Sequence, residues 1–255
     1  MKYLEDGKYF FHTDSDQLIY KNCYLYDIKS CNIRIIKNLG FGHVYDKLIN
    51  MEKLERNIRL GYLSKTYNNL IKTVDYLTNK IIKKFIYDNN ITDDDIIFIQ
   101  KDGLLIKKFV RTKDTKDPII PELRNIFSYV IFDEEKKAYL AKDEENRRMI
   151  TKGIRDKSIG LDDFLTKHLY KHNMDDFINI NNMICEFFGS NDKNLFTIPD
   201  RENPNNYKLI LKDGELSISK DIFEISDFDF SEIDIDYYFE TYISGFVKSI
   251  LMNVL

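Results

Sequence analysis

The segment between Glu52 and Tyr87 constrains the fold of this chain more than any other feature of its sequence. Apolar residues recur in it at steps of three to five positions, which is the spacing that gives an α-helix one apolar face. These residues are Leu54, Ile58, Leu63, Tyr67, Leu70, Val74, Leu77, Ile81 and Phe85. The pattern predicts one long amphipathic helix, or two helices in tandem, with Asn89-Asn90 as the stop. Gly61 predicts a break or a close packing contact, because glycine costs ~1 kcal/mol relative to alanine inside a helix.

Strand-like segments flank this helical segment on both sides. Residues 7–36 contain KYFF, a polar TDSD turn, QLIY and YLYDI, which predict a β-rich region with a hairpin and a further strand that ends at Asp27. After the helical segment, DIIFIQ and LLIKKFV are joined by Lys101-Asp102-Gly103. This join is typical of a β-hairpin, because glycine readily adopts positive φ. We therefore expect Asp102 at the tip of a hairpin.

The second half of the chain changes from strand patterns to helix patterns. Residues 126–153 predict further β structure, and residues 161–188 predict helix. YKLILKDGELSIS predicts a short return to β structure before a final helix over residues 235–255. Runs of strands followed by runs of helices are typical of the α+β class. We expect two lobes, residues 1–158 and residues 159–255, of which the second is mainly helical.

The charge of the chain limits how it can bind nucleic acid. Its formal net charge is −4 and its pI is near 5.7, so bulk charge alone does not hold nucleic acid and any such contact must be local. Lys and Arg are frequent from Lys53 to Lys116, whereas Asp221 to Glu240 is acidic without a Lys or Arg. The simplest interpretation of such a charge run is a solvated face.

Cysteine content and hydropathy predict where the protein works. The cysteines Cys23, Cys31 and Cys185 are too few and too scattered for a disulfide framework or a zinc site. The N-terminus lacks the regions of a signal peptide, and no apolar run approaches the length of a membrane span. Alanine is scarce, whereas Ile, Asn, Lys and Asp abound, which suggests an AT-rich phage or viral genome. We expect a soluble, cytoplasmic protein of a phage- or virus-infected cell, with no membrane partner.

Asp27 and Asp102 are the candidate metal ligands. Each lies beside a strand-like run, so their carboxylates can meet if the two strands share a sheet. Mg²⁺ is commonly held by one or two carboxylates, with substrate phosphates and water completing its octahedral coordination. The simpler alternative is that Asp27 caps a turn and that Asp102 is the ordinary aspartate of a Lys-Asp-Gly hairpin.

Five short motifs follow one another along the chain. Their matching residues are Asp27, Ser30 and Ile35 in DIKSCNIRI; Lys53, Asn57 and Gly61 in KLERNIRLG; Asp102 in FIQKDG; Lys136, Lys137 and Tyr139 with the later Lys152-Gly153; and the ending IDIDYYFETYISGFVKSIL. In residue type and in order, these motifs resemble those of the palm and thumb of family B DNA polymerases. The resemblance spans most of the chain.

The resemblance implies a fold and an activity. The fold is a palm-like domain over residues 1–158, with an antiparallel sheet, packed helices and a short fingers-like helix, followed by a thumb-like domain over residues 159–255. The activity is template-directed nucleotidyl transfer on primed DNA by a two-metal mechanism, with two Mg²⁺ ions held by Asp27 and Asp102 as the catalytic residues. The implied partners are primer-template DNA, nucleoside triphosphates and a second polymerase or replication subunit.

The resemblance also implies two groups of binding residues. The nucleotide-binding group is Lys53, Asn57, Arg56 and Ser30, and the nucleic-acid-binding group is Lys136, Lys137, Tyr139 and Lys152. A lysine of the first group neutralises phosphate charge that builds up in the transition state. The alternative for Arg56, and for the nearby Arg59, is ion pairing with Glu52 or Glu55 along the helix. The alternative for the second group is an exposed strand of alternating charge.

Departures from the family's pattern leave other functions open. Asn32 replaces the aromatic residue that packs under the sugar in the family, and Gln100 replaces the first acid of the third motif. The short spacing between Asp27 and Lys53 also leaves out much of the fingers. The resemblance therefore implies a minimal or split polymerase, or else an inactive polymerase-derived subunit that binds nucleic acid or protein. A third interpretation is a viral protein whose acidic segment from Asp221 to Glu240 binds a basic partner.

Overall fold

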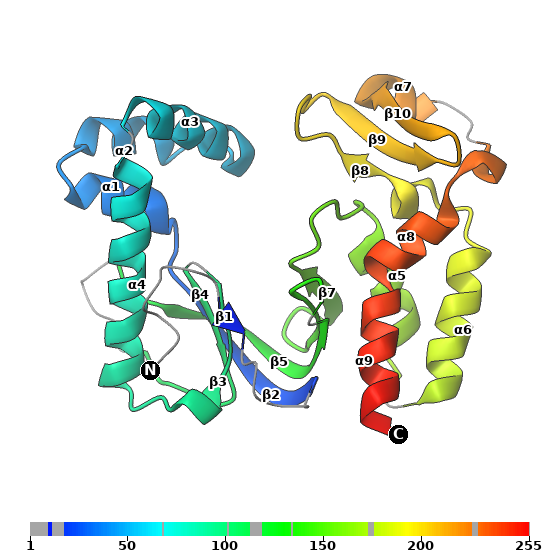
Figure 1. Ribbon diagram of the computed structural model, residues 1–255, viewed down its shortest axis with the longest axis horizontal. Coiled ribbons are helices and arrows are strands. Elements are labelled where there is room, and N and C mark those ends of the chain that lie inside the picture. The colour runs from blue at the N-terminus through cyan, green and yellow to red at the C-terminus, as the bar shows by residue number, and fades with distance from the viewer. Residues whose placement is uncertain are drawn as a thin grey trace. The chain divides into compact units, whose positions relative to one another are not determined.

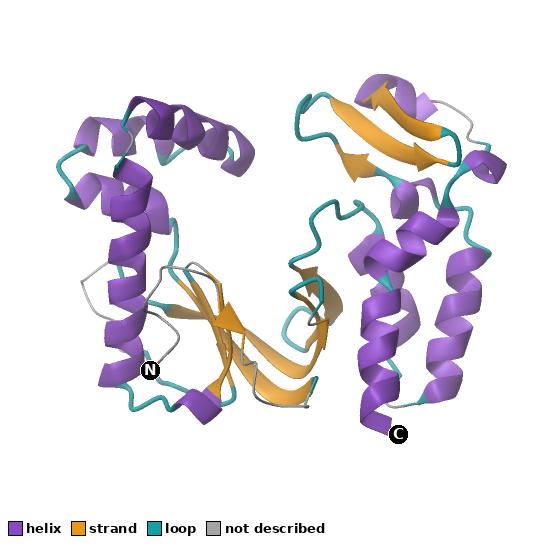
Figure 2. Cartoon of the chain, viewed as in Figure 1, coloured by secondary structure: helices purple, strands orange, loops and turns teal. Residues whose placement is uncertain are grey.

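The computed structural model describes residues 10–11, 18–67, 69–100, 102–112, 119–133, 135–172, 176–225 and 229–254. The chain forms two compact units. Unit 1 comprises Met1–Asp14 and Asn22–Ile126, and unit 2 comprises Ser15–Lys21 and Phe127–Leu255. Figure 1 labels the elements and Figure 2 colours them by type.

Unit 1 contains antiparallel strands in the spatial order β1-β3-β4-β2. The strands are β1 (Phe10–Phe11), β2 (Ile19–Asp27), β3 (Ile96–Gln100) and β4 (Gly103–Ile106), and the first residues of β2 belong to unit 2. Gln100 of β3 pairs with Gly103 of β4, so the hairpin predicted around Asp102 is confirmed. The hairpin predicted between KYFF and QLIY is wrong, because β1 pairs with β3. The TDSD turn lies outside the described residues.

The described part of unit 1 also contains four α-helices. They are α1 (Cys31–Asn38), α2 (Gly42–Leu48), α3 (Lys53–Thr66) and α4 (Leu70–Asp88), and a short 3₁₀ helix, η1 (Asp93–Asp95), leads into β3. Helices α1, α2 and α3 gather at one end of α4, and α1 packs against both α2 and α4 (Figure 1). The buried side chains of α1 join those of α4 and of the strands in one apolar core.

Two sequence expectations for this region need correction. The sequence predicts β structure for residues 31–36, but they form α1 because Cys31 and Ile35, one helical turn apart, are buried together against α4. Tertiary packing here outweighs the strand preference of the isoleucines. Gly61 lies inside α3, where a Cβ would meet nothing within 4 Å, so neither the break nor the close contact is present. The tandem helices instead divide around Tyr67.

Unit 2 begins with an antiparallel meander. Its strands are β5 (Glu122–Asp133), which starts in unit 1, β6 (Ala138–Asp143) and β7 (Arg148–Lys152). Apolar residues of these strands form one core with the helices α5 (Leu161–Leu169), α6 (Phe177–Phe188), α8 (Ile235–Tyr242) and α9 (Ser244–Val254). The final helical segment is thus two helices, divided at Ile243.

A second, smaller sheet completes unit 2. Its strands are β8 (Ile198–Pro199), β9 (Asn206–Leu211) and β10 (Gly214–Ser219), and it is accompanied by α7 (Lys220–Ile225), η2 (Lys193–Phe196) and η3 (Phe230–Glu232). The buried Tyr238 of α8 ties it to the core, because its hydroxyl accepts from the Ile210 N–H at 2.8 Å and donates to the Phe196 carbonyl oxygen. The short β segment predicted for this region is confirmed.

The α+β class, with an antiparallel sheet and packed helices, is confirmed. The compact units begin and end at other residues than the predicted domains 1–158 and 159–255, and the palm-like and thumb-like identities of those domains stay a prediction. Within the described part of the chain, no helix combines the length and the apolar character needed to cross a bilayer.

Candidate functional site

Asp27, the last residue of β2, and Asp102, in the turn before β4, lie on adjacent stretches of backbone in unit 1. Asp27 is the last residue of β2 and pairs with Gly103, the first residue of β4. The Ile28 N–H donates a hydrogen bond to the Asp102 carbonyl oxygen at 3.2 Å. Residues paired across antiparallel strands have Cα atoms about 4.5–5.5 Å apart, so the two backbones are adjacent at this point. Both aspartates are half-buried.

The pKa of the buried Cys31 thiol is affected by the negative charges at this strand end. Burial raises the pKa of Cys31 to about 12, and the contact with the Thr78 hydroxyl at 3.3 Å opposes that rise. The carboxylates of Asp102, Asp27 and Asp75 raise the pKa of Cys31 further, because negative charge disfavours a thiolate. Cys31 therefore stays protonated at neutral pH. Three carboxylates lie within electrostatic range of one sulfur atom at the start of α1.

The residues at this strand end fit Mg²⁺ better than a transition metal. Carboxylate oxygens are the hard ligands that Mg²⁺ prefers, and one or two of them with substrate phosphates suffice. Cys31 does not add a soft ligand, because its thiol is buried and protonated. Within the described residues, no group of three or more His, Cys, Asp or Glu side chains is placed to hold a metal by itself. A site built on Asp27 and Asp102 would therefore depend on substrate phosphates for further ligands.

The four predicted nucleotide-binding residues are all in unit 1. Lys53 and Asn57 lie one turn apart on α3, Asn57 is exposed and Arg56 is half-buried. The described part of Lys53 is its backbone, at the first position of the helix. Ser30 adopts a left-handed φ of 53° directly before α1, and its side chain makes no cap hydrogen bond there. The nucleotide-binding role of these residues stays a prediction.

The ion pairs of α3 bear on the alternative for Arg56. The structure shows an ion pair on this helix between Arg59 and Glu55, with 3.8 Å between Nη2 of Arg59 and Oε1 of Glu55. Both side chains are more than half exposed. Exposed pairs of this kind contribute about 0–1 kcal/mol. The ion-pairing interpretation is thus confirmed for the neighbouring Arg59.

The predicted nucleic-acid-binding residues are in unit 2. Lys137 and Lys152 are exposed, whereas Tyr139 is 3% exposed and packs against Phe132 with 5.9 Å between ring centroids. Lys136 donates to the Glu240 carbonyl oxygen of α8. Lys136, Lys137 and Lys152 are therefore the members of this group that solvent reaches. Their contact with nucleic acid stays a prediction.

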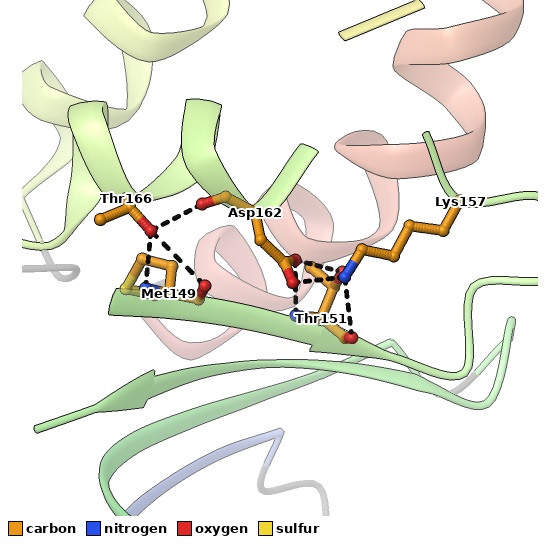
Figure 3. Close-up of polar contacts among 5 residues, drawn as sticks. All are labelled: Met149, Thr151, Lys157, Asp162 and Thr166. Carbon is orange, nitrogen blue, oxygen red and sulfur yellow. Dashed lines mark hydrogen bonds and ion pairs between the residues drawn. The ribbon is translucent and has the colours of Figure 1, made fainter. Parts of the chain in front are cut away.

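The segment after Lys152 is held in place by Asp162, as Figure 3 shows. The Asp162 carboxylate, in the first turn of α5, accepts from the Thr151 N–H at 2.9 Å and from its hydroxyl at 2.8 Å. It also pairs with Lys157, which lies between β7 and α5. One turn later in α5, the Thr166 hydroxyl accepts from the Met149 N–H at 2.9 Å. These contacts attach α5 to β7, and the sequence motifs carry no signal for them.

The structure places the two residues that depart from the family pattern, Asn32 and Gln100, in unit 1. Asn32 is exposed on α1, one residue after Cys31. Gln100 ends β3 opposite Gly103. Asp75, on α4, is not among the predicted site residues, and no local sequence signal marks it because only packing of α4 brings it near Cys31.

The likeness of this chain to known proteins is structural and weak. No family model matches the chain, and no curated protein matches its sequence. Among solved structures, the chain is similar to the family B DNA polymerase from the hyperthermophilic archaeon Pyrobaculum calidifontis, with 12% sequence identity and a TM-score of 0.41. The match covers 99% of this chain and 47% of that polymerase, so this chain spans about half the length of the protein it matches. The similarity is one of fold only, and it is weak.

Proposed function

We propose that this protein catalyses Mg²⁺-dependent, template-directed nucleotidyl transfer on primed DNA, with Asp27 and Asp102 as its metal-binding carboxylates. One observation carries the proposal: two acids remote in sequence lie at adjacent ends of paired strands, Asp27 opposite Gly103 and Ile28 bonded to Asp102. The order of the five sequence motifs supports it independently. Mg²⁺ ions at such a site would supply charge stabilisation to the attacking and leaving oxygens of the phosphoryl group.

The remaining predicted residues have distinct roles in this proposal. Lys53 and Asn57 would bind the triphosphate and base of the incoming nucleotide from α3, with Arg56 and Ser30 beside them. Lys137 and Lys152, which are exposed in unit 2, would bind phosphates of the primer-template backbone. Lys136 and Tyr139 would position this segment through their contacts with Glu240 and Phe132.

Primer extension with Mg²⁺ tests the proposal. Asp27→Asn and Asp102→Asn remove the charges that hold the metal, and each is expected to lower the extension rate by about a thousandfold, since metal stabilisation of phosphoryl transfer is worth several kcal/mol. Asp94→Asn, an exposed aspartate before β3, is the matched control and is expected to leave the rate unchanged. If the wild-type protein binds primer-template and Mg²⁺ but incorporates no nucleotide, alone or with a partner subunit, the proposal is wrong.

A second function is favoured by the departures in the motifs. Gln100 cannot supply the charge of the acid it replaces, and Asn32 is exposed on α1 with no aromatic ring to pack under a sugar. These features favour a catalytically inactive subunit that binds nucleic acid or a replication protein. In that case Asp27→Asn leaves both nucleic-acid binding and biological activity intact, whereas a polymerase with this substitution keeps nucleic-acid binding and loses its activity.

A further inference from the structure

We propose that unit 1 holds a second site, which binds single-stranded nucleic acid along a row of aromatic side chains on α2 and at the end of α3. The aromatic row consists of Tyr45, Phe41 and Tyr67. The site is separate from the Asp27 and Asp102 pair, and it needs no metal ion.

The contacts within the aromatic row are direct. Phe41 precedes α2, and Tyr45 follows it by one turn, with the Tyr45 N–H bonded to the Phe41 carbonyl oxygen at 3.2 Å. The Phe41 ring meets the Tyr67 ring edge to face, with 5.7 Å between centroids. His43 adds a fourth ring, 6.4 Å from Phe41. The row thus joins the start of α2 to the C-terminal end of α3, which lie together at one end of α4 (Figure 1).

Cations accompany these rings. The Lys37 ammonium, in the last turn of α1, lies 4.3 Å from the centroid of the Tyr45 ring. On α3, the Lys65 ammonium lies 5.7 Å from the centroid of Tyr62, a ring that is 63% exposed. Tyr67 itself is 47% exposed. Solvent therefore reaches the rings of Tyr62 and Tyr67, whereas Phe41 and Tyr45 are half-buried and pack partly against the core of unit 1.

The charge of this region points to a polyanion as the ligand. Residues 29–72 contain nine Lys and Arg but only three acids, in a chain whose net charge is −4. Positive charge concentrated in this way attracts phosphates locally, although the chain as a whole is acidic. Positive charge next to exposed rings is the combination that binds single strands, because unpaired bases stack on the rings and the backbone follows the cations. Duplex DNA offers the cations the same phosphates but hides its base faces, so the rings select unpaired bases.

Binding of a fluorescent oligothymidylate of about 12 nucleotides, within the size range of single-strand sites, tests this site. The measurement is anisotropy with EDTA present, so that the result does not depend on a metal at Asp27 and Asp102. Tyr67→Leu is expected to weaken binding by roughly 5- to 150-fold, because stacking on one ring contributes about 1–3 kcal/mol per base. Tyr67→Phe keeps the ring and is expected to bind like wild type.

Two further variants separate stacking from charge. Lys37→Gln is expected to reduce the slope of log affinity against log salt by about 0.7, the value for one phosphate contact on a single strand. Tyr87→Leu is the matched control, because Tyr87 is 79% exposed in the last turn of the same unit's α4, away from the aromatic row, and it is expected to change nothing.

Three outcomes would overturn the site. One is that Tyr67→Leu and Tyr87→Leu bind the oligonucleotide equally well. Another is that Tyr67→Leu weakens the binding of heparin, a polyanion without bases, as much as it weakens the binding of the oligonucleotide. The third is that wild type binds anionic lipid vesicles but no oligonucleotide. Asp27→Asn removes a charge required for nucleotidyl transfer but leaves the aromatic row unchanged, so it is expected to bind the oligonucleotide like wild type. Failure of the catalytic proposal and failure of this site therefore give different results.

Discussion

The three cysteines of the chain differ sharply in environment. Cys23 in β2 and Cys31 in α1 are buried, whereas Cys185 on α6 is exposed. Burial raises the pKa of both Cys23 and Cys31 to about 12. Only the thiolate is an efficient nucleophile, so the two buried thiols are protected both by access and by protonation.

Thiol labelling follows from this difference. In native protein at pH 7 to 9, a disulfide reagent such as dithionitrobenzoate is expected to modify one thiol quickly and two only after unfolding. Cys185→Ser should abolish the fast reaction. Cys23 and Cys31 should remain slow over this whole pH range, because burial raises the pKa of each thiol to about 12. Fast labelling of native Cys185→Ser protein would show that Cys23 or Cys31 is not buried.

Two glycines should respond in opposite directions to alanine. Gly153 has a φ of +88°, and a Cβ there would lie 2.5 Å from the Lys137 carbonyl oxygen, so Gly153→Ala is expected to lower the free energy of unfolding by at least about 1–2 kcal/mol. Gly61 lies in α3 with open space around its Cβ position, so Gly61→Ala is expected to raise it by about 0.5–1 kcal/mol. Urea denaturation with an unchanged m-value measures both. Equal effects of the two substitutions would contradict the left-handed backbone of Gly153.

At the scale of elements, α5 is attached to β7 by one carboxylate as well as by its apolar face. Asp162 and Asp163 are consecutive residues in the first turn of α5, so both interact favourably with the positive end of the helix dipole. Of the two, Asp162 is the one that bonds Thr151 and Lys157 (Figure 3). Substituting each aspartate in turn therefore distinguishes the stability contributed by the Asp162 hydrogen bonds and ion pair from that contributed by the helix dipole.

Alanine at each position measures the network. Asp162→Ala is expected to lower the free energy of unfolding by about 1–3 kcal/mol, because the buried Thr151 N–H and hydroxyl lose their acceptor. Asp163→Ala is expected to cost about 1 kcal/mol or less, since it removes a helix-dipole interaction of an exposed side chain. Chemical denaturation of the two variants side by side gives the difference. Similar values for both would mean that the Asp162 contacts add nothing to stability.

At the scale of the whole molecule, charge is divided between the two units. Unit 1 has an excess of five Lys and Arg over Asp and Glu, whereas unit 2 has an excess of nine acids, which together give the net charge of −4. By charge, unit 1 as a whole would attract a polyanion, whereas unit 2 would do so only at particular lysines. The two nucleic-acid contacts proposed above therefore differ in kind.

Paired lysine variants test this division. Lys137→Gln with Lys152→Gln is expected to weaken binding of primer-template duplex and reduce its salt slope by about 1.8, near 0.9 for each phosphate contact, without changing oligothymidylate binding. Lys167→Gln with Lys171→Gln, exposed lysines at and after the end of α5, is the matched control and should alter neither. Anisotropy titrations over a salt series provide the comparison. Loss of duplex binding in the control pair would show that unit 2 acts by diffuse charge.

Local patterns in the sequence predicted much of the fold. The hairpin at Asp102 follows from Lys-Asp-Gly between two apolar runs, and the tandem helices up to Asp88 follow from the spacing of their apolar residues. The α+β class follows from the order of these segments. Such features depend on neighbours in the sequence, so they can be inferred without knowing how distant segments pack.

Contacts between distant segments were decided only by the tertiary structure. Isoleucines in residues 31–36 favour a strand locally, but burial against α4 makes this segment a helix. Only the strand order could place Asp27 beside Asp102, and only packing of α4 brings Asp75 near Cys31. The rings of Phe41 and Tyr67 likewise meet although α2 and α3 separate them in the sequence. Sequence by itself determined which segments become strands and most of the helices, since those choices depend on local spacing, whereas the candidate sites depend on contacts across many residues, which only the folded chain brings together.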